Sequence, residues 1–254
     1  MVQATFDDAN PLTVGLWKFP DGSAFSATRQ TNEFVAALPG YRAKGLLAVS
    51  LNFQGGAPLS GSFSSQAWDN TAFNSDGSLK PAYLARMDQV IRALDAQGMV
   101  AILGYFYFDQ DERLNGETAI ENAVTNATQW VLDQGYTNVL IEIDNEADNP
   151  TYNYDILKPA RVSELITTVQ TQSANYGRRL YVSTSFSGGA IPISNVVQAA
   201  DFTLLHGNGQ TSSGITSMVN TIRAFGTNKP IIFNEDSTSL DNFQAATNAH
   251  VSWG

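Results

Sequence analysis

The sequence predicts an α/β fold, a (β/α)8 barrel, from two observations. Short apolar runs rich in β-branched residues alternate with segments whose apolar residues recur at helical spacing, and this alternation is typical of parallel strands joined by helices. Two of the apolar runs end in an amide followed by a glutamate, at residues 138–146 and 230–236. In a (β/α)8 barrel the C-terminal ends of the strands carry the functional side chains, so the two glutamates are expected there.

Eight strands are expected. The first lies at either 2–6 or 13–19, and the sequence does not decide between them. The other seven are expected at 46–53, 99–106, 138–146, 180–186, 201–205, 230–236 and from residue 250 onward. Helices are expected between them, at 31–38 with Thr31 as cap and Pro39 as stop, and at 81–98, 117–135, 162–177, 195–200, 215–225 and 240–247.

The length of 254 residues suits a single (β/α)8 domain, and no linker or repeat divides it. We therefore expect one domain over 1–254. No helix follows the last expected strand, whereas an intact barrel would cover that strand with one. The sequence thus predicts a barrel truncated after strand eight, or a fragment.

Composition narrows the classes of partner. The net charge is −10, so no basic footprint for nucleic acid exists, while a neutral polymer such as a glucan is not repelled. There is no cysteine, and the two histidines are too few for a histidine-based metal site. No run of 18 apolar residues predicts a membrane span. The composition is compatible with any compartment, with an extracellular or periplasmic location favoured, and leaves the oligomeric state open.

The segment from Glu142 to Glu146, which reads Glu-Ile-Asp-Asn-Glu, resembles the fourth-strand signature of the large clan of (β/α)8-barrel retaining glycoside hydrolases, above all the cellulase-like family 5. The resemblance implies that Glu146, after the asparagine, is the general acid/base. It also implies a nucleophile at the end of strand seven, where Glu235 stands. The sixth-strand histidine of the clan corresponds to His206, and the eighth-strand tryptophan that floors the sugar site corresponds to Trp253. The resemblance implies no cofactor.

Four departures indicate a divergent branch of the clan. Ala147 stands where proline usually follows the acid/base, and Asn208 where an aromatic residue often follows the sixth-strand histidine. Residues 51–54 lack the second-strand arginine, and residues 105–108 replace the third-strand histidine. The substrate of family 5 therefore does not transfer to this chain.

The chemistry of glycoside hydrolysis fits two glutamates. A retaining enzyme needs one protonated carboxyl for the leaving oxygen and one carboxylate to attack the anomeric carbon, about 5–5.5 Å apart. Asn145 can hydrogen-bond the sugar 2-hydroxyl as charge develops. Glu142 and Asp144 share a strand face with Glu146, and we favour buried, hydrogen-bonded acids over a direct role for them.

Further candidates for substrate binding stand at other strand ends. Asn52 and Gln54 end the second strand and suit hydroxyl recognition as well as they suit a backbone-binding turn. Trp253 and Tyr107 could stack on a sugar face or belong to the core. The long polar loop at 54–80 is expected to be functional, and Asp109, Asp111 and Asp148 are interpreted as loop acids and not as a cation site.

The resulting hypothesis is a retaining glycoside hydrolase for β-linked saccharides, such as a β-glucan or a related plant polysaccharide or oligosaccharide. The alternative is a carbohydrate-binding or degenerate barrel without catalysis. A barrel isomerase or aldolase for sugar phosphates is a third class, disfavoured by the acidic balance and by the lack of a clear phosphate-binding loop.

Overall fold

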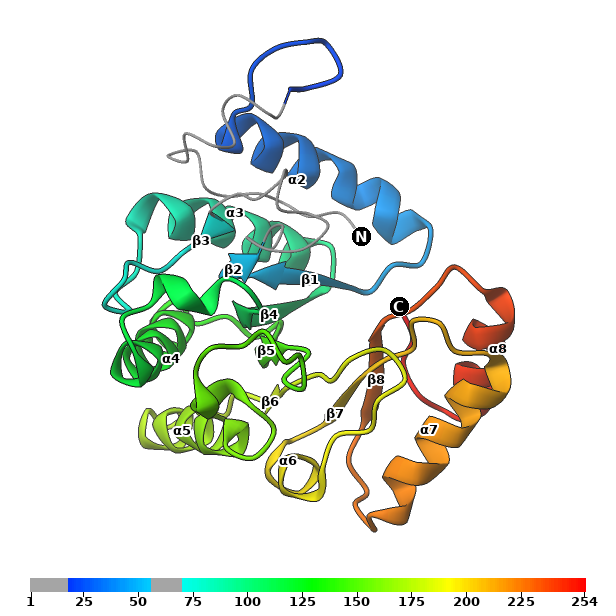
Figure 1. Ribbon diagram of the computed structural model, residues 1–254. Helices are drawn as coiled ribbons and strands as arrows, with labels where there is room; N and C mark the ends of the chain where they lie inside the picture. The colour runs from blue at the N-terminus through cyan, green and yellow to red at the C-terminus, as the bar shows by residue number, and fades with distance from the viewer. Residues whose placement is uncertain (1–17, 56–69) are drawn as a thin grey trace. The chain divides into compact units, whose positions relative to one another are not determined.

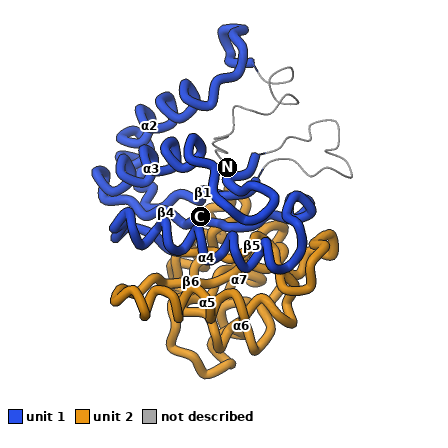
Figure 2. The backbone as a smooth tube through the Cα atoms, turned by 90° about the vertical axis from the view of Figure 1, so that its left-hand side faces the viewer, with its two compact units in different colours: residues 1–140 blue, residues 141–254 orange. Residues whose placement is uncertain are grey.

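The computed structural model describes residues 18–55 and 70–254. The chain divides into two compact units, residues 1–140 and 141–254, which Figure 2 colours separately. The single-domain prediction stays a prediction. The strand expected at 2–6, most of its alternative at 13–19, and residues 56–69 of the polar loop lie outside the described residues. Within the described residues no helix is long and apolar enough to cross a membrane.

Unit 1 alternates strands with helices, as expected (Figure 1). Its elements are α2 (Ala27–Ala43), β1 (Ala48–Asn52), β2 (Gln54–Gly55), β3 (Asn70–Thr71), α3 (Pro81–Ala96), β4 (Val100–Tyr107), the 3-10 turn Asp111–Arg113 and α4 (Glu117–Asp133). β1 and β4 pair in parallel from Ala48↔Val100 to Asn52↔Gly104. Pro81 opens α3, and the side chains at its helical spacing are buried, which confirms the pattern that predicted this helix.

The first helix corrects the sequence prediction at both ends. Ser26, not Thr31, caps it, because the Ser26 Oγ accepts from the backbone N of Arg29 at 3.3 Å. Thr31 instead lies inside the helix and donates to the carbonyl of Ala27 at 2.8 Å. Pro39 does not stop the helix, which continues to Ala43. The missing N–H of proline removes one backbone hydrogen bond, and burial of Leu38 beside it holds the helix together.

Unit 2 continues the alternation. Strand β5 (Val139–Asn145) crosses the boundary between the units, and the later elements are the 3-10 turn Asp155–Leu157, α5 (Val162–Asn175), β6 (Val182–Ser183), α6 (Ser194–Ala199), β7 (Thr203–His206), α7 (Ser212–Ala224), β8 (Ile231–Glu235) and α8 (Leu240–Asn248). β5 pairs with β6 and β7 with β8, both in parallel. Ser252 bridges in parallel to Ile232, where the eighth strand is expected.

Strand β6 is shorter than the predicted 180–186. Only Val182 and Ser183 form the strand. The hydroxyl of Thr184 donates to the carbonyl of Asp144 at 2.9 Å and also contacts the Asp144 carboxylate. Side-chain hydrogen bonds thus add to the backbone bonds that join this segment to β5, among them the Ser185 N–H to the Asp144 carbonyl at 3.4 Å.

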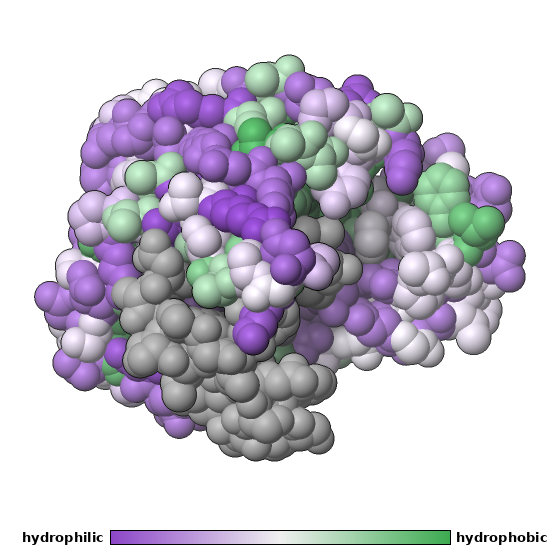
Figure 3. Space-filling view, turned by 90° about the horizontal axis from the view of Figure 1, so that it is seen from above, coloured by the Kyte–Doolittle hydropathy of each residue, from purple (hydrophilic) through white to green (hydrophobic). Residues whose placement is uncertain are grey.

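The core of unit 2 behind β7 and β8 is an apolar cluster. Its buried members are Val197, Leu205, Ile215, Met218, Val219, Ile222, Ile231, Phe233 and Ala246. Helix α7 supplies four of them, and α8 packs beside α7 (Figure 1). The face seen in Figure 3 is in contrast largely hydrophilic where it is coloured, as the acidic composition leads one to expect.

This cluster is expected to carry much of the stability of unit 2. Ile222 is 2% exposed in the cluster, whereas Leu240 on α8 is 77% exposed. Ile222→Ala should lower the free energy of unfolding by about 2–5 kcal/mol, since it removes buried methyl groups and leaves a cavity. Urea unfolding followed by circular dichroism measures this. Leu240→Ala is the control and should change stability by less than about 0.5 kcal/mol; equal losses in both variants would contradict the packing described.

Candidate active site

Strand β5 ends in a left-handed residue that is not glycine. Glu146 has φ of +56°, a conformation that costs an ordinary side chain about 1 kcal/mol or more. Neighbouring groups hold it: its backbone N–H donates to the Ser185 Oγ at 3.0 Å, and the backbone N–H of Ala147 donates to the Ser185 carbonyl at 2.9 Å. The hydroxyl of Tyr152 donates to the carbonyl of Asn145 at 2.7 Å. The strained turn is therefore fixed on both sides, and strain of this kind is typical of functional sites.

A β-bulge turns Glu235 away from the core. Ile231 and Phe233 on β8 both face the apolar cluster on α7, so strict alternation would send Glu235 to that face as well. The register instead shifts after Leu205↔Phe233, and the next pair is His206↔Glu235. Asn234 is the extra residue. Because of it, Glu235 lies on the same side as His206, and bulges next to active sites often redirect a side chain in this way.

His206 joins the two glutamates. Its imidazole is fully buried, and its Nδ1 lies 3.0 Å from Glu146 Oε1 and 3.8 Å from Glu235 Oε2. Because both distances start from the same Nδ1 atom, Glu146 Oε1 and Glu235 Oε2 are at most 6.8 Å apart. Glu146 and Glu235 keep 19% and 25% of their side-chain surface exposed, so both remain reachable from solvent. The two strand-end glutamates thus converge on one imidazole nitrogen, and the upper bound admits the carboxyl separations known for glycoside hydrolysis.

Asn208 supplies a second hydrogen bond to Glu235. Its Nδ2 donates to Glu235 Oε1 at 3.0 Å. Its backbone is packed closely against Gly188, where an added Cβ would lie 2.9 Å from both the Asn208 Cβ and its carbonyl oxygen. The carboxylate of Glu235 is therefore held by an amide on one oxygen and faces His206 with the other.

Two buried groups change their pKa because of their surroundings. Burial raises the pKa of Glu142, and the nearby charges of Glu235 and Glu146 raise it further, against the opposing effects of His206 and a Ser185 hydrogen bond. Burial lowers the pKa of His206, but the hydrogen bond to Glu146 and the charges of Glu142, Glu235 and Glu146 outweigh this and raise it above its ordinary value. The pKa values of Glu142 and His206 are thus both shifted upward within one cluster of titratable groups.

Trp253 lies on the side of the apolar cluster. It packs against the cluster behind β7 and β8, and its Nε1–H donates to Asp236 Oδ2 at 2.7 Å. Its ring centroid is 5.5 Å from that of Phe243 on α8. Trp253 is thus linked through its indole N–H to Asp236, the residue directly after Glu235. Its predicted role as a floor for the sugar stays a prediction.

Three predicted binding residues belong to unit 1, and each contacts another residue of that unit. The carbonyl of Asn52 accepts from the Tyr83 hydroxyl at 2.7 Å. Gln54 is fully buried, and its Nε2 donates to the carbonyl of Gln110 at 3.2 Å. The ring of Tyr107 lies 4.4 Å from that of Phe108, centroid to centroid. Their part in substrate binding stays a prediction.

The loop acids differ in exposure. Asp111, interpreted from the sequence as a solvated loop acid, is fully buried in the 3-10 turn Asp111–Arg113, so this interpretation is wrong for Asp111. The Asp148 carboxylate accepts from the backbone N–H and the hydroxyl of Ser187, at 2.7 and 3.0 Å. Over residues 18–55 and 70–254, no group of three His, Asp or Glu side chains is arranged to hold a metal ion.

The sequence did not reveal the roles of three contributors to this site, Ser185, Asn208 and Asp236, which contact the ends of β5 and β8. Ser185 and Asp236 stand at the ends of the predicted strands 180–186 and 230–236, and Asn208 stands three residues after the predicted strand 201–205. Position near a strand end was the one available signal.

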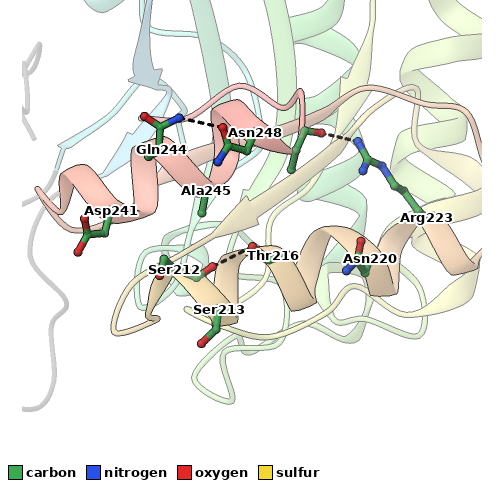
Figure 4. Close-up of a pocket in the computed structure, with 10 residues that line it drawn as sticks. Ser212, Ser213, Thr216, Asn220, Arg223, Asp241, Gln244, Ala245 and Asn248 are labelled. Atoms are coloured by element: carbon green, nitrogen blue, oxygen red, sulfur yellow. Dashed lines mark hydrogen bonds between the residues drawn. The ribbon is translucent and has the colours of Figure 1, made fainter.

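A separate groove runs between α7 and α8 (Figure 4), with a volume of about 620 Å³. Hydroxyl and amide side chains dominate its lining, among them Ser212, Thr216, Asn220, Gln244 and Asn248. Neither glutamate of the β5–β8 site lines it. The groove is therefore distinct from the site built on the strand ends.

No protein-family model matches the chain, and no curated protein matches it. Several solved structures are similar to the chain. A glycoside hydrolase is similar over 86% of this chain and 54% of its own, with a TM-score of 0.59 at 13% identity. A glycoside hydrolase family 5 enzyme from Prevotella bryantii B14 is similar over 88% and 77%, with a TM-score of 0.57 at 12% identity. An endo-1,4-beta-mannanase from Rhizomucor miehei is similar over 88% and 80%, with a TM-score of 0.54 at 13% identity. This chain spans about half the length of the first of these.

These likenesses confirm the (β/α)8-barrel fold predicted from the sequence. They also confirm the resemblance in fold to the cellulase-like clan of family 5.

The raised pKa of Glu142 makes a prediction for stability against pH. A carboxyl whose folded pKa exceeds its unfolded pKa stabilises the fold below the unfolded value, and this contribution is lost as pH rises toward the folded value. Glu142→Gln has the shape of the protonated glutamate but cannot ionise, so it does not lose this stability as the pH rises. Its stability relative to the wild type should therefore rise between pH 4 and pH 7, as measured by urea unfolding.

Glu164→Gln is the matched control. Its exposed carboxylate has a pKa lowered by Arg161, so this variant should become less stable relative to the wild type over the same pH range, by a small amount. A relative stability of Glu142→Gln that stays flat or falls would show that Glu142 is ionised in the folded protein.

Proposed function

We propose that the chain is a retaining glycoside hydrolase that acts on β-linked saccharides, such as a β-glucan or a related plant polysaccharide or oligosaccharide. The observation that supports this best is the convergence of Glu146 and Glu235 on His206 Nδ1, at 3.0 and 3.8 Å. Glu146 acts as the general acid/base, and Glu235 acts as the nucleophile. The shared fold with a broad specificity endoglucanase and an endo-1,4-beta-mannanase agrees with a β-linked substrate.

The contacts of the two carboxyl groups suit this division of roles. Glu146 Oε1 lies 3.0 Å from Nδ1 of His206, a side chain that can exchange a proton with it. The Asn208 amide donates to Glu235 Oε1 at 3.0 Å and orients that carboxyl group, as a nucleophile requires.

The reaction then follows the double-displacement scheme. Glu146 protonates the glycosidic oxygen while Glu235 attacks the anomeric carbon; the glycosidic C–O bond breaks, the leaving group departs as an alcohol, and a glycosyl ester with Glu235 forms. Glu146, now ionised, removes a proton from water, which attacks the same carbon and releases Glu235. The bound of 6.8 Å between the two nearest oxygens admits the separation of about 5–5.5 Å that this route needs.

Hydrolysis of aryl β-glycosides and soluble β-glucans tests the proposal. The wild type is expected to be active, and Glu146→Gln and Glu235→Gln are each expected to lower kcat/KM by roughly 10²-fold or more while remaining folded. Glu164→Gln, an exposed acid on α5, is the control and should retain activity.

The stereochemistry of the first-formed sugar, followed by proton NMR, completes the test. Retention at the anomeric carbon is expected. Inversion would contradict the nucleophilic role of Glu235. A folded wild type without activity on any substrate would favour the second reading, a carbohydrate-binding or degenerate barrel, which saccharide binding by calorimetry would then detect.

Asn208 is expected to support the nucleophile. Asn208→Ala removes the amide that donates to Glu235 Oε1, and hydrogen bonds to charged groups contribute about 1.5–3 kcal/mol. The kcat for an activated aryl glycoside should therefore fall by roughly 10-fold or more, with a smaller change in KM. Asn195→Ala, which removes an exposed amide bonded to the carbonyl of Pro159, is the control. Unchanged kcat in Asn208→Ala would contradict this role.

A further inference from the structure

The residue directly after Glu235 is anchored by three hydrogen bonds. Asp236 Oδ2 accepts from Trp253 Nε1 at 2.7 Å and from Asn242 Nδ2 at 3.0 Å. Asp236 Oδ1 accepts from the backbone N–H of Ser237 at 2.7 Å. Both carboxylate oxygens of Asp236 are thus engaged, by partners that do not contact the Glu235 carboxyl group in the hydrogen bonds of the described residues.

The side chains that hold Asp236 are themselves fixed. Asn242 is 1% exposed in the first turn of α8, and its Nδ2 also donates to the carbonyl of Gln210 at 3.0 Å. Trp253 packs against the apolar cluster and lies beside Phe243. We call Asp236 with its partners Trp253 and Asn242 the anchor. The anchor joins the end of β8 to α8, to the loop after β7 and to the expected eighth strand.

The backbone after His206 leaves Asp236 little room to move. Gly207 donates its N–H to the carbonyl of Glu235 at 2.7 Å. A Cβ at Gly207 would lie 2.7 Å from Asp236 Cγ and 2.8 Å from Ile215 Cδ1, so any other residue there would force these side chains to shift. The ends of β7 and β8 are thus interlocked immediately beyond the bulge.

We propose that Asp236 is a positioning residue for Glu235, and that Trp253 acts in this through its indole N–H. The inference rests on the proposed function for its kinetic part. The bulge at Asn234 changes the side to which the following side chains point, and the strand ladder ends directly afterwards at Glu235. Asp236, held outward by Trp253 and Asn242, supplies this contact, so that the adjacent Glu235 stays directed toward His206 and Glu146.

The inference separates two roles for Trp253. A ring that only stacks on sugar contributes to binding, so Trp253→Phe would raise KM and leave kcat nearly unchanged. An N–H that positions Glu235 contributes to the chemical step. Trp253→Phe keeps an aromatic ring but removes the donor to Asp236, and should then lower kcat with KM within about twofold.

The first measurement needs no substrate. The chain has two histidines, so His250→Gln leaves His206 as the single imidazole for an NMR titration. The carboxyl groups that raise the pKa of His206 are Glu142, Glu146 and Glu235. Glu235→Gln should therefore lower the pKa of His206. Asp236→Ala, Asp236→Asn and Trp253→Phe should lower it too, because Glu235 turns away when its anchor is lost. Asp241→Asn, an exposed acid in the first turn of α8, should not.

The second measurement is kinetic, on an activated aryl glycoside. Asp236→Ala should lower kcat by about 10-fold or more, since a displacement of 1 Å at a reacting group can cost roughly 10²-fold. Asp236→Ala with Trp253→Phe should be no slower than Asp236→Ala alone, because both variants break one contact. Where Asp236→Ala does not fold, Asp236→Asn and Trp253→Phe carry the test.

The outcomes separate this inference from the proposed function. The anchor is refuted by an unchanged pKa of His206 in the Asp236 and Trp253 variants when Glu235→Gln lowers it. It is also refuted by a KM effect alone in Trp253→Phe. A wild type without hydrolysis, in which the anchor variants still lower the pKa of His206, would refute the hydrolase and support the anchor.

Discussion

The extra residue in β8 is the constraint on which the site depends. Ile231 and Phe233 must face α7 to complete the apolar cluster, and a regular strand would then bury Glu235 on the same face. The bulge at Asn234 satisfies both demands, since the cluster keeps its two apolar side chains and the carboxylate reaches His206. Burying a carboxylate in the cluster without a partner would cost several kcal/mol, so packing and site geometry favour the same register.

A second constraint acts on β5, where strain takes the place of a bulge. Glu146 adopts a left-handed conformation. Its backbone N–H donates to the Ser185 Oγ, and the backbone N–H of Ala147 donates to the Ser185 carbonyl, so the segment after β6 holds this turn. The Ser/Thr-rich segment after β6 contacts β5 through side chains as well as backbone. The Thr184 hydroxyl donates to the Asp144 carbonyl, and the Ser185 hydroxyl accepts from the Glu146 N–H, beside the backbone bonds that Ser185 makes with Asp144 and Ala147. The polar exit of a short strand thus positions the proposed acid/base.

The sequence could predict what depends on periodicity and on strand order. The helix from Pro81, the strands that end in Glu146 and Glu235 and the (β/α)8 fold follow from patterns that repeat along the chain. It could not predict contacts made by single residues in loops. Asn208 and Asp236 depend on a one-residue register shift, and Ser26 replaced Thr31 as cap because several residues near a helix start can fill that role.

The departures from the clan pattern are connected in the structure. Asn208 stands where an aromatic residue often follows the sixth-strand histidine, and its amide reaches Glu235 at 3.0 Å. Trp253, in the position of the eighth-strand tryptophan, donates to Asp236 and packs on the cluster behind the sheet. Glu235 is thus supported by an amide on its own side and by an anchored neighbour on the other. In the proposed hydrolase, these two kinds of contact would have separate effects: Asp236 would keep the direction of Glu235, and the Asn208 amide would hold its carboxyl group, in place of the aromatic residue that is usual after the sixth-strand histidine.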